Sequence, residues 1–221
     1  MGKMFTYQGE RLKTWNPFTG CGFNCSYCWA RKLAEGKLKN SYPNGFIPTT
    51  HPDRFNKRFK PDDFVFVCSM GDISFAPSIV WNQVYITAQN HPETKFLLCT
   101  KNPAIYLNLA WRLDNVYYGC TIETNKHYGV SKAPRTYDRY LAFKELPYSH
   151  KFLSIEPVMS FELEGFIGWI ANIQPEIIEI GADNYHNNLP EPQSQYLEKF
   201  LTIIKRYTPV VIEKQGLERL L

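Results

Sequence analysis

The sequence predicts an α/β fold in which about six or seven parallel strands form a partial or complete (β/α) barrel. Short apolar runs alternate with segments of helical length along most of the chain, which is the order of repeated βα units. The apolar runs are continuous, as expected for strands covered on both faces. Polar residues follow most of the runs, which favours a barrel over an open doubly wound sheet, because a barrel builds its site from the loops after all its strands.

Seven apolar runs are the predicted strands: near Leu12–Trp15, then Phe64–Cys68, Lys95–Cys99, Val116–Ile122, Phe152–Ile155, Ile177–Ile180 and Val210–Ile212. The predicted helices lie between or after them: Trp29 to about Leu38, Ser78–Asn90, Pro103–Arg112, Pro134–Leu146, Phe161–Ile173 and Glu191–Tyr207. Prolines stand at or near several helix starts, where the N–H that proline lacks is not needed. The polar residues after the strands are Ser69 to Asp72, Thr100, Lys101, Thr121, Glu123, Glu156, Gly181, Asp183, Glu213 and Lys214.

The composition indicates a globular chain without a membrane segment. The 221 residues are 44% hydrophobic and 21% charged, and 15% are aromatic, which provides ample surface for a core. No apolar run approaches the roughly 18 residues that span a bilayer, and the N-terminus lacks the apolar core of a signal peptide. We therefore expect one domain over residues 1–221, located in the cytoplasm, with no membrane partner.

Positive charge is concentrated in one part of the chain. Residues 31–60 hold eight Lys or Arg and two acidic residues, a local charge of +6, whereas the whole chain has a net charge of +4. Such a segment either binds an anionic partner such as a nucleic acid or is a solvated connection. Within it, residues 51–60 interleave Phe55 and Phe59 with four cationic side chains. Such side chains can bind phosphates and stack on bases, but we favour the alternative that both rings pack on the barrel.

Three of the six cysteines, Cys21, Cys25 and Cys28, lie within eight residues, in the loop between the first strand and the first helix. Three thiolates in one loop can converge on a soft metal centre. A structural zinc site normally needs four ligands, and the next candidates are His51 and Cys68. An iron–sulfur cluster is the better interpretation, because three thiolates would leave one iron open to a cofactor or substrate.

The spacing C-x3-C-x2-C, with Tyr27 before the third cysteine, resembles the motif of the radical S-adenosylmethionine (SAM) superfamily. Four further blocks are similar to a short prokaryotic and phage-borne group of radical SAM-like proteins: Trp15–Cys21, Ser69–Asp72, Thr100–Pro103 and Leu153–Pro157. The resemblance implies a 4Fe-4S cluster on the three cysteines and SAM as cofactor. It also implies reductive cleavage of SAM to methionine and a 5′-deoxyadenosyl radical, which abstracts hydrogen from a substrate, with electrons from an external donor of the flavodoxin or ferredoxin type.

Some positions of this sequence match the superfamily motifs directly, and others depart from them. Cys21, Cys25 and Cys28 match the cluster ligands, and Tyr27 matches the aromatic position. Many superfamily members carry Gly-Gly-Glu after the second strand to receive the amino group of SAM. Here that place reads Ser69-Met70-Gly71-Asp72, where the acid is one carbon shorter and one glycine is missing.

Ser69, Gly71 and Asp72 are therefore candidate cofactor contacts, although Ser69 and Asp72 are also favoured types for capping the following helix. Thr121 and Glu123 lie where ribose contacts often occur, and Lys101 could meet a carboxylate as a point charge. The substrate implied is unknown, with a nucleic acid or another macromolecule as candidates. The alternatives are a non-catalytic iron–sulfur protein that binds a partner and a zinc-stabilised module that binds nucleic acid.

Overall fold

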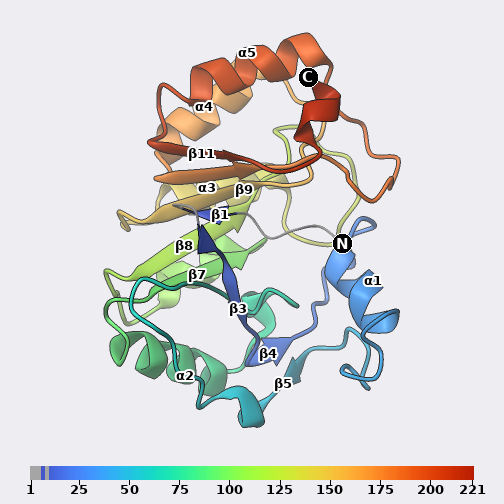
Figure 1. Ribbon diagram of the computed structural model, residues 1–221. Coiled ribbons are helices and arrows are strands. Elements are labelled where there is room, and N and C mark those ends of the chain that lie inside the picture. The colour runs from blue at the N-terminus through green and yellow to red at the C-terminus, as the bar shows by residue number, and fades with distance from the viewer. Residues whose placement is uncertain (1–5, 8–9) are drawn as a thin grey trace.

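One sheet of seven parallel strands organises the structure, a computed structural model that describes residues 6–7 and 10–221 (Figure 1). In space the strands follow the order of the chain: β3 (Lys13–Trp15), β6 (Phe64–Val67), β7 (Lys95–Thr100), β8 (Val116–Thr121), β9 (Lys151–Ile155), β10 (Ile177–Ile180) and β11 (Val210–Glu213). β3 and β11 lie at opposite edges of the sheet and are not paired with each other, so the barrel is not closed. The prediction of a partial (β/α) barrel is confirmed.

Among the described residues, five α-helices connect or flank the strands: α1 (Trp29–Glu35), α2 (Ser78–Gln89), α3 (Thr136–Lys144), α4 (Leu163–Ile173) and α5 (Ser194–Ile204). Four 3-10 turns supplement them: η1 (Pro52–Arg54), η2 (Ile73–Phe75), η3 (Pro103–Asn108) and η4 (Leu217–Leu220). Two antiparallel pairs in the described part of the chain lie outside the sheet: β1 (Thr6–Tyr7) with β2 (Glu10–Arg11), and β4 (Phe18–Thr19) with β5 (Thr49–Thr50). In the described part of the chain, no helix is long and apolar enough to cross a membrane.

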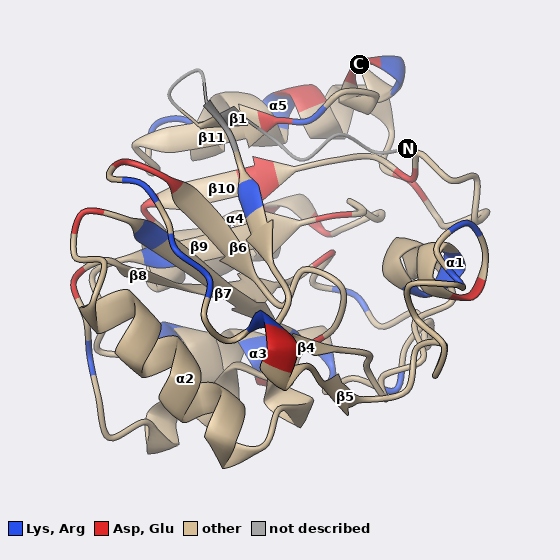
Figure 2. Cartoon of the chain, turned by 60° about the horizontal axis from the view of Figure 1, so that its bottom comes forward, with Lys and Arg blue, Asp and Glu red and all other residues tan. Residues whose placement is uncertain are grey.

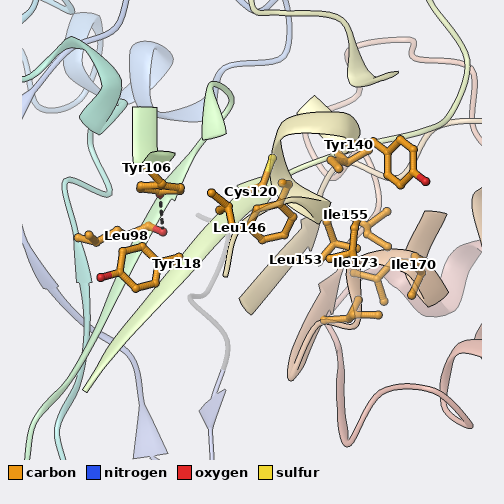
Figure 3. Close-up of a cluster of buried hydrophobic side chains, with 14 of the residues drawn as sticks. Leu98, Tyr106, Tyr118, Cys120, Tyr140, Leu146, Leu153, Ile155, Ile170 and Ile173 are labelled. Atoms are coloured by element: carbon orange, nitrogen blue, oxygen red, sulfur yellow. Dashed lines mark hydrogen bonds between the residues drawn. The ribbon is translucent and has the colours of Figure 1, made fainter. Parts of the chain in front are cut away.

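The two faces of the sheet carry different cores. Side chains such as Leu98, Leu153 and Ile155 form the outer core together with the helices, as Figure 3 shows for part of this cluster. A smaller cluster fills the inner face from the first halves of the strands: Leu12, Phe64, Leu97, Tyr117, Phe152 and Ile177. Alternating side chains of a strand point to opposite faces, so each strand supplies both cores. The apolar inner cluster leaves the carboxyl ends of the strands to polar side chains.

The segment after β7 differs most from its predicted form, because it is the 3-10 turn Pro103–Asn108 and not a helix to Arg112. The buried Tyr106 hydroxyl shares its proton between the carbonyls of Leu98 (2.9 Å) and Gly119 (3.1 Å), which holds the turn against the sheet. Figure 3 shows the bond to Leu98. The backbone leaves helical geometry at Leu109. α4 begins two residues late because the Glu162 side chain caps it, accepting from the N–H groups of residues 164 and 165.

Residues 51–60 cover the free edge of β3. Phe55 and Phe59 pack against the outer core, which confirms the favoured prediction for these rings. Lys57 Nζ donates to the Thr14 carbonyl (2.7 Å) and Arg54 donates to the Asn16 carbonyl (3.3 Å). An edge strand presents unpaired carbonyls, and these two cations satisfy two of them. Part of the local positive charge is therefore used within the fold.

Candidate functional site

The cysteine loop, Cys21–Cys28, lies between β4 and α1 and is fixed to the loop that follows β6. The Gly20 N–H donates to the Met70 carbonyl (2.9 Å), and the Asp72 N–H donates to the Gly20 carbonyl (3.2 Å). Gly20 and Gly71 thus form an isolated parallel bridge. The bridge holds the cysteines at the carboxyl ends of β3 and β6, the same end of the half-barrel as the polar strand ends.

Both residues of this bridge have to be glycine. Gly20 has a φ of +87°, and a Cβ on it would lie 2.3 Å from the Ile47 carbonyl oxygen. A Cβ on Gly71 would lie 2.6 Å from the Gly20 carbonyl oxygen, which is backbone and cannot move aside cheaply. The close approach of the two loops therefore depends on the missing side chains.

The substitution Gly71→Ala is expected to destabilise the protein by about 2 kcal/mol, because the added methyl group separates the two loops. Urea unfolding measures the loss, and the maleimide reaction of the cysteine loop should become faster. Gly168→Ala in α4 is the matched control, because a Cβ there meets nothing within 4 Å. Equal stability of Gly71→Ala and the wild type would contradict the role of the bridge.

Each sulfur of the cysteine loop has one hydrogen-bond partner. Cys21 Sγ accepts from the Phe23 N–H, and Cys28 Sγ accepts from the N–H of Arg31, both at 3.4 Å. Cys25 Sγ lies 3.1 Å from the Ser131 hydroxyl. All three thiols are free and half-buried.

The thiols of Cys21 and Cys28 are neutral in their present surroundings. Burial, followed by the charge of Asp72, raises the pKa of Cys21 to about 12. Burial also raises the pKa of Cys28. Metal binding requires thiolates, so a bound cation has to displace these protons and compensate the buried negative charge.

Three cysteine thiols in one loop are donors of the kind that an iron–sulfur cluster uses, and they are one ligand short of a structural zinc site. In the parts of the chain that the structure describes, no three His, Cys, Asp or Glu side chains are grouped as ligands of one metal ion. The two nearest candidates for a fourth zinc ligand are occupied, since His51 Nε2 bonds the Thr19 hydroxyl (2.8 Å) and Cys68 is buried in the outer core.

A buried charged cluster lies beside the cysteine loop and joins three of the predicted residues, Tyr27, Lys101 and Glu123. The Tyr27 hydroxyl donates to Glu123 Oε1 (2.6 Å), and Lys101 Nζ pairs with the same oxygen. Arg139 donates to Glu123 Oε2 (2.9 Å) and to the Thr121 carbonyl (3.0 Å). Glu123 is 1% exposed, and its carboxylate is held by these three side chains. We call these four side chains the Glu123 cluster.

The charges of the Glu123 cluster stabilise one another. Burial alone would raise the pKa of Glu123, but Arg139 and then Lys101 lower it to about 2. Burial opposes the charge of Lys101, yet Glu123 raises its pKa well above the ordinary value. The cluster consists of two cations and one anion, and it therefore presents a net positive charge next to the cysteine loop.

The other predicted contacts already have structural partners. Asp72 caps η2 through the Ser74 N–H (3.0 Å), and it also accepts from the Ser74 and Thr100 hydroxyls and the Lys101 N–H. The Ser69 hydroxyl donates to Asn16 Oδ1 (3.2 Å). The Thr121 hydroxyl lies 3.6 Å from Cys99 Sγ. Asp72 therefore caps the 3-10 turn η2, whereas the predicted helix α2 starts after Pro77 without a side-chain cap. The cofactor contacts stay predictions.

Sequence reasoning missed Arg139 and Ser131. Arg139 has a signal, because it occupies the same helical face as Phe143 and Leu146, and a cation on a buried face needs a buried anion. Ser131 lies in an irregular loop and carries no such signal. Its neighbour in space, Cys25, is 106 residues away in the chain.

A second polar cluster lies at the other side of the sheet. Ser154 donates to Glu179 Oε1 (2.7 Å), and Lys214 pairs with Glu156 and Glu179. Figure 2 shows that the strands carry few charges, with an acidic residue in β10 as one of the exceptions. Burial raises the pKa of Glu179, which Lys214 only partly offsets. This cluster ties β9, β10 and β11 together at their carboxyl ends.

The fold is similar to solved structures of spore photoproduct lyase. A double mutant with bound AdoMet and a dinucleoside spore photoproduct matches with a TM-score of 0.62 and 11% identity, over 96% of this chain and 78% of that chain. A cysteine-to-alanine mutant with the dinucleoside matches with a TM-score of 0.62 and 12% identity, over 88% and 74%. At these identities the likeness concerns the fold, which is radical SAM-like.

Comparison with curated proteins gives no match. A family model, by contrast, matches residues 10–170, which is more than half of the chain. The matched region includes the cysteine loop, the Gly20–Gly71 bridge and the whole Glu123 cluster. The chain therefore belongs to the family DUF5131, described as "protein of unknown function".

Proposed function

We propose that this protein is a radical SAM enzyme in which Cys21, Cys25 and Cys28 hold a 4Fe-4S cluster. When bound, the cluster supplies the electron that cleaves SAM to methionine and a 5′-deoxyadenosyl radical, which takes a hydrogen atom from the substrate. The observation that carries the proposal is the set of three free, half-buried thiols in one loop at the carboxyl end of a radical SAM-like half-barrel.

The Glu123 cluster provides the electrostatic support for this site. A cluster with three thiolate ligands is anionic, and the net positive charge of Lys101, Arg139 and Glu123 favours it. Lys101 has three N–H donors and gives one to Glu123, so two remain for the carboxylate of SAM. Glu123 and Arg139 then act by fixing the position of Lys101 and of the Tyr27 ring, which lies 5.3 Å from Lys101 Nζ.

The loop after β6 supports the proposed contact with the amino group of SAM. Asp72 already accepts four hydrogen bonds, so its part is to hold the loop. The Ser69 oxygen donates its proton to Asn16 and keeps its lone pairs as acceptors. Ser69 and the Gly71 backbone are therefore the better candidates for the amino group, with Thr121 as the candidate for the ribose.

A nucleic acid is the first substrate class to test. The segment 31–60 carries the local charge of +6, and the similar spore photoproduct lyase structures hold a dinucleoside. The cations that face solvent in this segment, such as Lys37, Lys39 and Arg58, are the proposed phosphate contacts. Phe55 and Phe59 are not proposed to stack on bases, because both pack on the outer core. The electron donor is proposed to be a flavodoxin or ferredoxin.

Electron paramagnetic resonance (EPR) of anaerobically reconstituted, dithionite-reduced protein tests the cofactor assignment. We expect about four irons and four sulfides per chain. SAM should change the EPR signal, because it binds the iron that has no cysteine ligand. Zinc in place of iron would favour the zinc-stabilised alternative. A full cluster whose EPR signal does not change when SAM is added would favour a non-catalytic iron–sulfur protein.

A further inference from the structure

The segment Val130–Lys132 lies along the cysteine loop and contacts it through the main chain at two points. The Ser26 N–H donates to the Val130 carbonyl (3.0 Å), and the Lys132 N–H donates to the Phe23 carbonyl (2.6 Å). We call Val130–Lys132 the strap. Because both bonds are made by backbone groups, the strap holds its central residue, Ser131, opposite Cys25 whatever the side chains are.

The Ser131 hydroxyl is oriented toward the sulfur of Cys25. Its oxygen accepts from the Ala133 N–H (3.0 Å), so its own proton is free to be donated. The possible acceptors are Cys25 Sγ at 3.1 Å and the Phe23 carbonyl at 3.4 Å. A metal-bound cysteine has no proton, so between Ser131 and such a sulfur only the hydroxyl can donate.

This contact distinguishes Cys25 from the other two cysteines. Cys21 and Cys28 accept from main-chain N–H groups within or next to their own loop, which are present with any side chain except proline. Cys25 is contacted by a side chain from a distant segment. Hydrogen bonds to the sulfurs of an iron–sulfur cluster are among the features that set its reduction potential. A donor stabilises the more negative, reduced state more than the oxidised state, and it thereby raises the potential.

We propose that Ser131 is a redox-tuning residue, whose hydroxyl donates a hydrogen bond to the Cys25 thiolate and raises the reduction potential of the cluster. The inference rests on the proposed function, since it requires a cluster on the cysteine loop. It adds a role for the loop after β8, which approaches the cysteines only through tertiary packing. Ser131 acts on the cluster only through its hydrogen bond to Cys25. It is therefore a positioning residue, and no contact with the substrate is assigned to it.

An EPR-monitored redox titration of the reconstituted protein tests this proposal. Ser131→Ala is expected to lower the equilibrium constant for one-electron reduction about tenfold, a shift of about 59 mV to more negative potential. Ser131→Thr keeps the hydroxyl and should stay near the wild type. Ser131→Cys keeps a weak donor and should lie between them. Ser26→Ala removes a neighbouring exposed hydroxyl and is the matched control, with an unchanged potential expected.

Iron and sulfide contents separate the failure of this inference from failure of the proposed function. If all variants hold a full cluster with equal potentials, the tuning role is overturned and the cluster assignment stands. In a second outcome, Ser131→Ala loses iron, and Ser131→Thr and Ser131→Cys have equal reduction potentials. Ser131 would then only hold the loop, and the tuning role would again be overturned. A wild-type chain that takes up no cluster would overturn both.

Discussion

Cys25→Ala is expected to abolish the visible absorbance of the reconstituted protein, because two thiolates cannot replace the three that one cluster requires. Iron and sulfide should fall to background, and the formation of 5′-deoxyadenosine should fall with them. Cys21 and Cys28 belong to the same ligand set, so alanine at either position should give the same result. Visible spectroscopy with iron and sulfide assays measures the loss.

Cys120→Ala is the matched control for this experiment. Cys120 is fully buried in the outer core and has no part in the cysteine loop, so its removal should cost stability on the order of 1 kcal/mol and leave the cluster intact. A fully coloured Cys25→Ala protein, or an equal loss of colour in Cys120→Ala, would contradict the ligand assignment.

Glu123→Gln is expected to lower the free energy of unfolding at pH 7 by about 3 kcal/mol. The substitution leaves Lys101 and Arg139 buried without a counter-charge, and breaking a buried ion pair on one side typically costs this much. Glu145→Gln is the control, because Glu145 is exposed and its pair with Lys144 lies at the surface, so the change should stay within about 0.5 kcal/mol. Urea unfolding of the three proteins gives the comparison.

The difference in the free energy of unfolding between wild type and Glu123→Gln should become smaller as the pH falls. The pKa of Glu123 is lowered in the folded state to about 2, so its carboxylate stabilises the folded state fully above the unfolded-state pKa. This contribution, of about 3 kcal/mol, decreases as the pH falls from about 4.5 toward 2. The two proteins should therefore converge at acid pH. If the difference in the free energy of unfolding is constant from pH 7 to pH 3, Glu123 is not a charged carboxylate in the folded protein.

The sequence predicted the strands well because the signal is local. Each strand is a short continuous apolar run, and the seven runs correspond to the seven strands of the sheet, with ends that differ by at most one residue. The helix ends were less accurate, because caps such as the Glu162 side chain decide them. The η3 turn was expected as a helix, since nothing in the local pattern shows that Tyr106 bonds two strands.

The candidate site was predictable where it lies within one loop and not where it depends on packing. Cys21, Cys25 and Cys28 are separated by a few residues and were found from their spacing. Arg139 and Ser131 reach the site from α3 and from the loop before it, through contacts that span more than 100 residues in the case of Ser131. The dual use of Asp72, as cap and as anchor of the loop after β7, also needed the structure.

The central claim is tested most directly by 5′-deoxyadenosine, detected by mass spectrometry. Anaerobically reconstituted wild-type protein is incubated with SAM and dithionite, with Cys28→Ala as the control. We expect 5′-deoxyadenosine and methionine from the wild type alone. A substrate search that begins with nucleic acids would then follow. Protein with a full complement of iron and sulfide that forms no 5′-deoxyadenosine, with or without added nucleic acid, would contradict radical chemistry at this site.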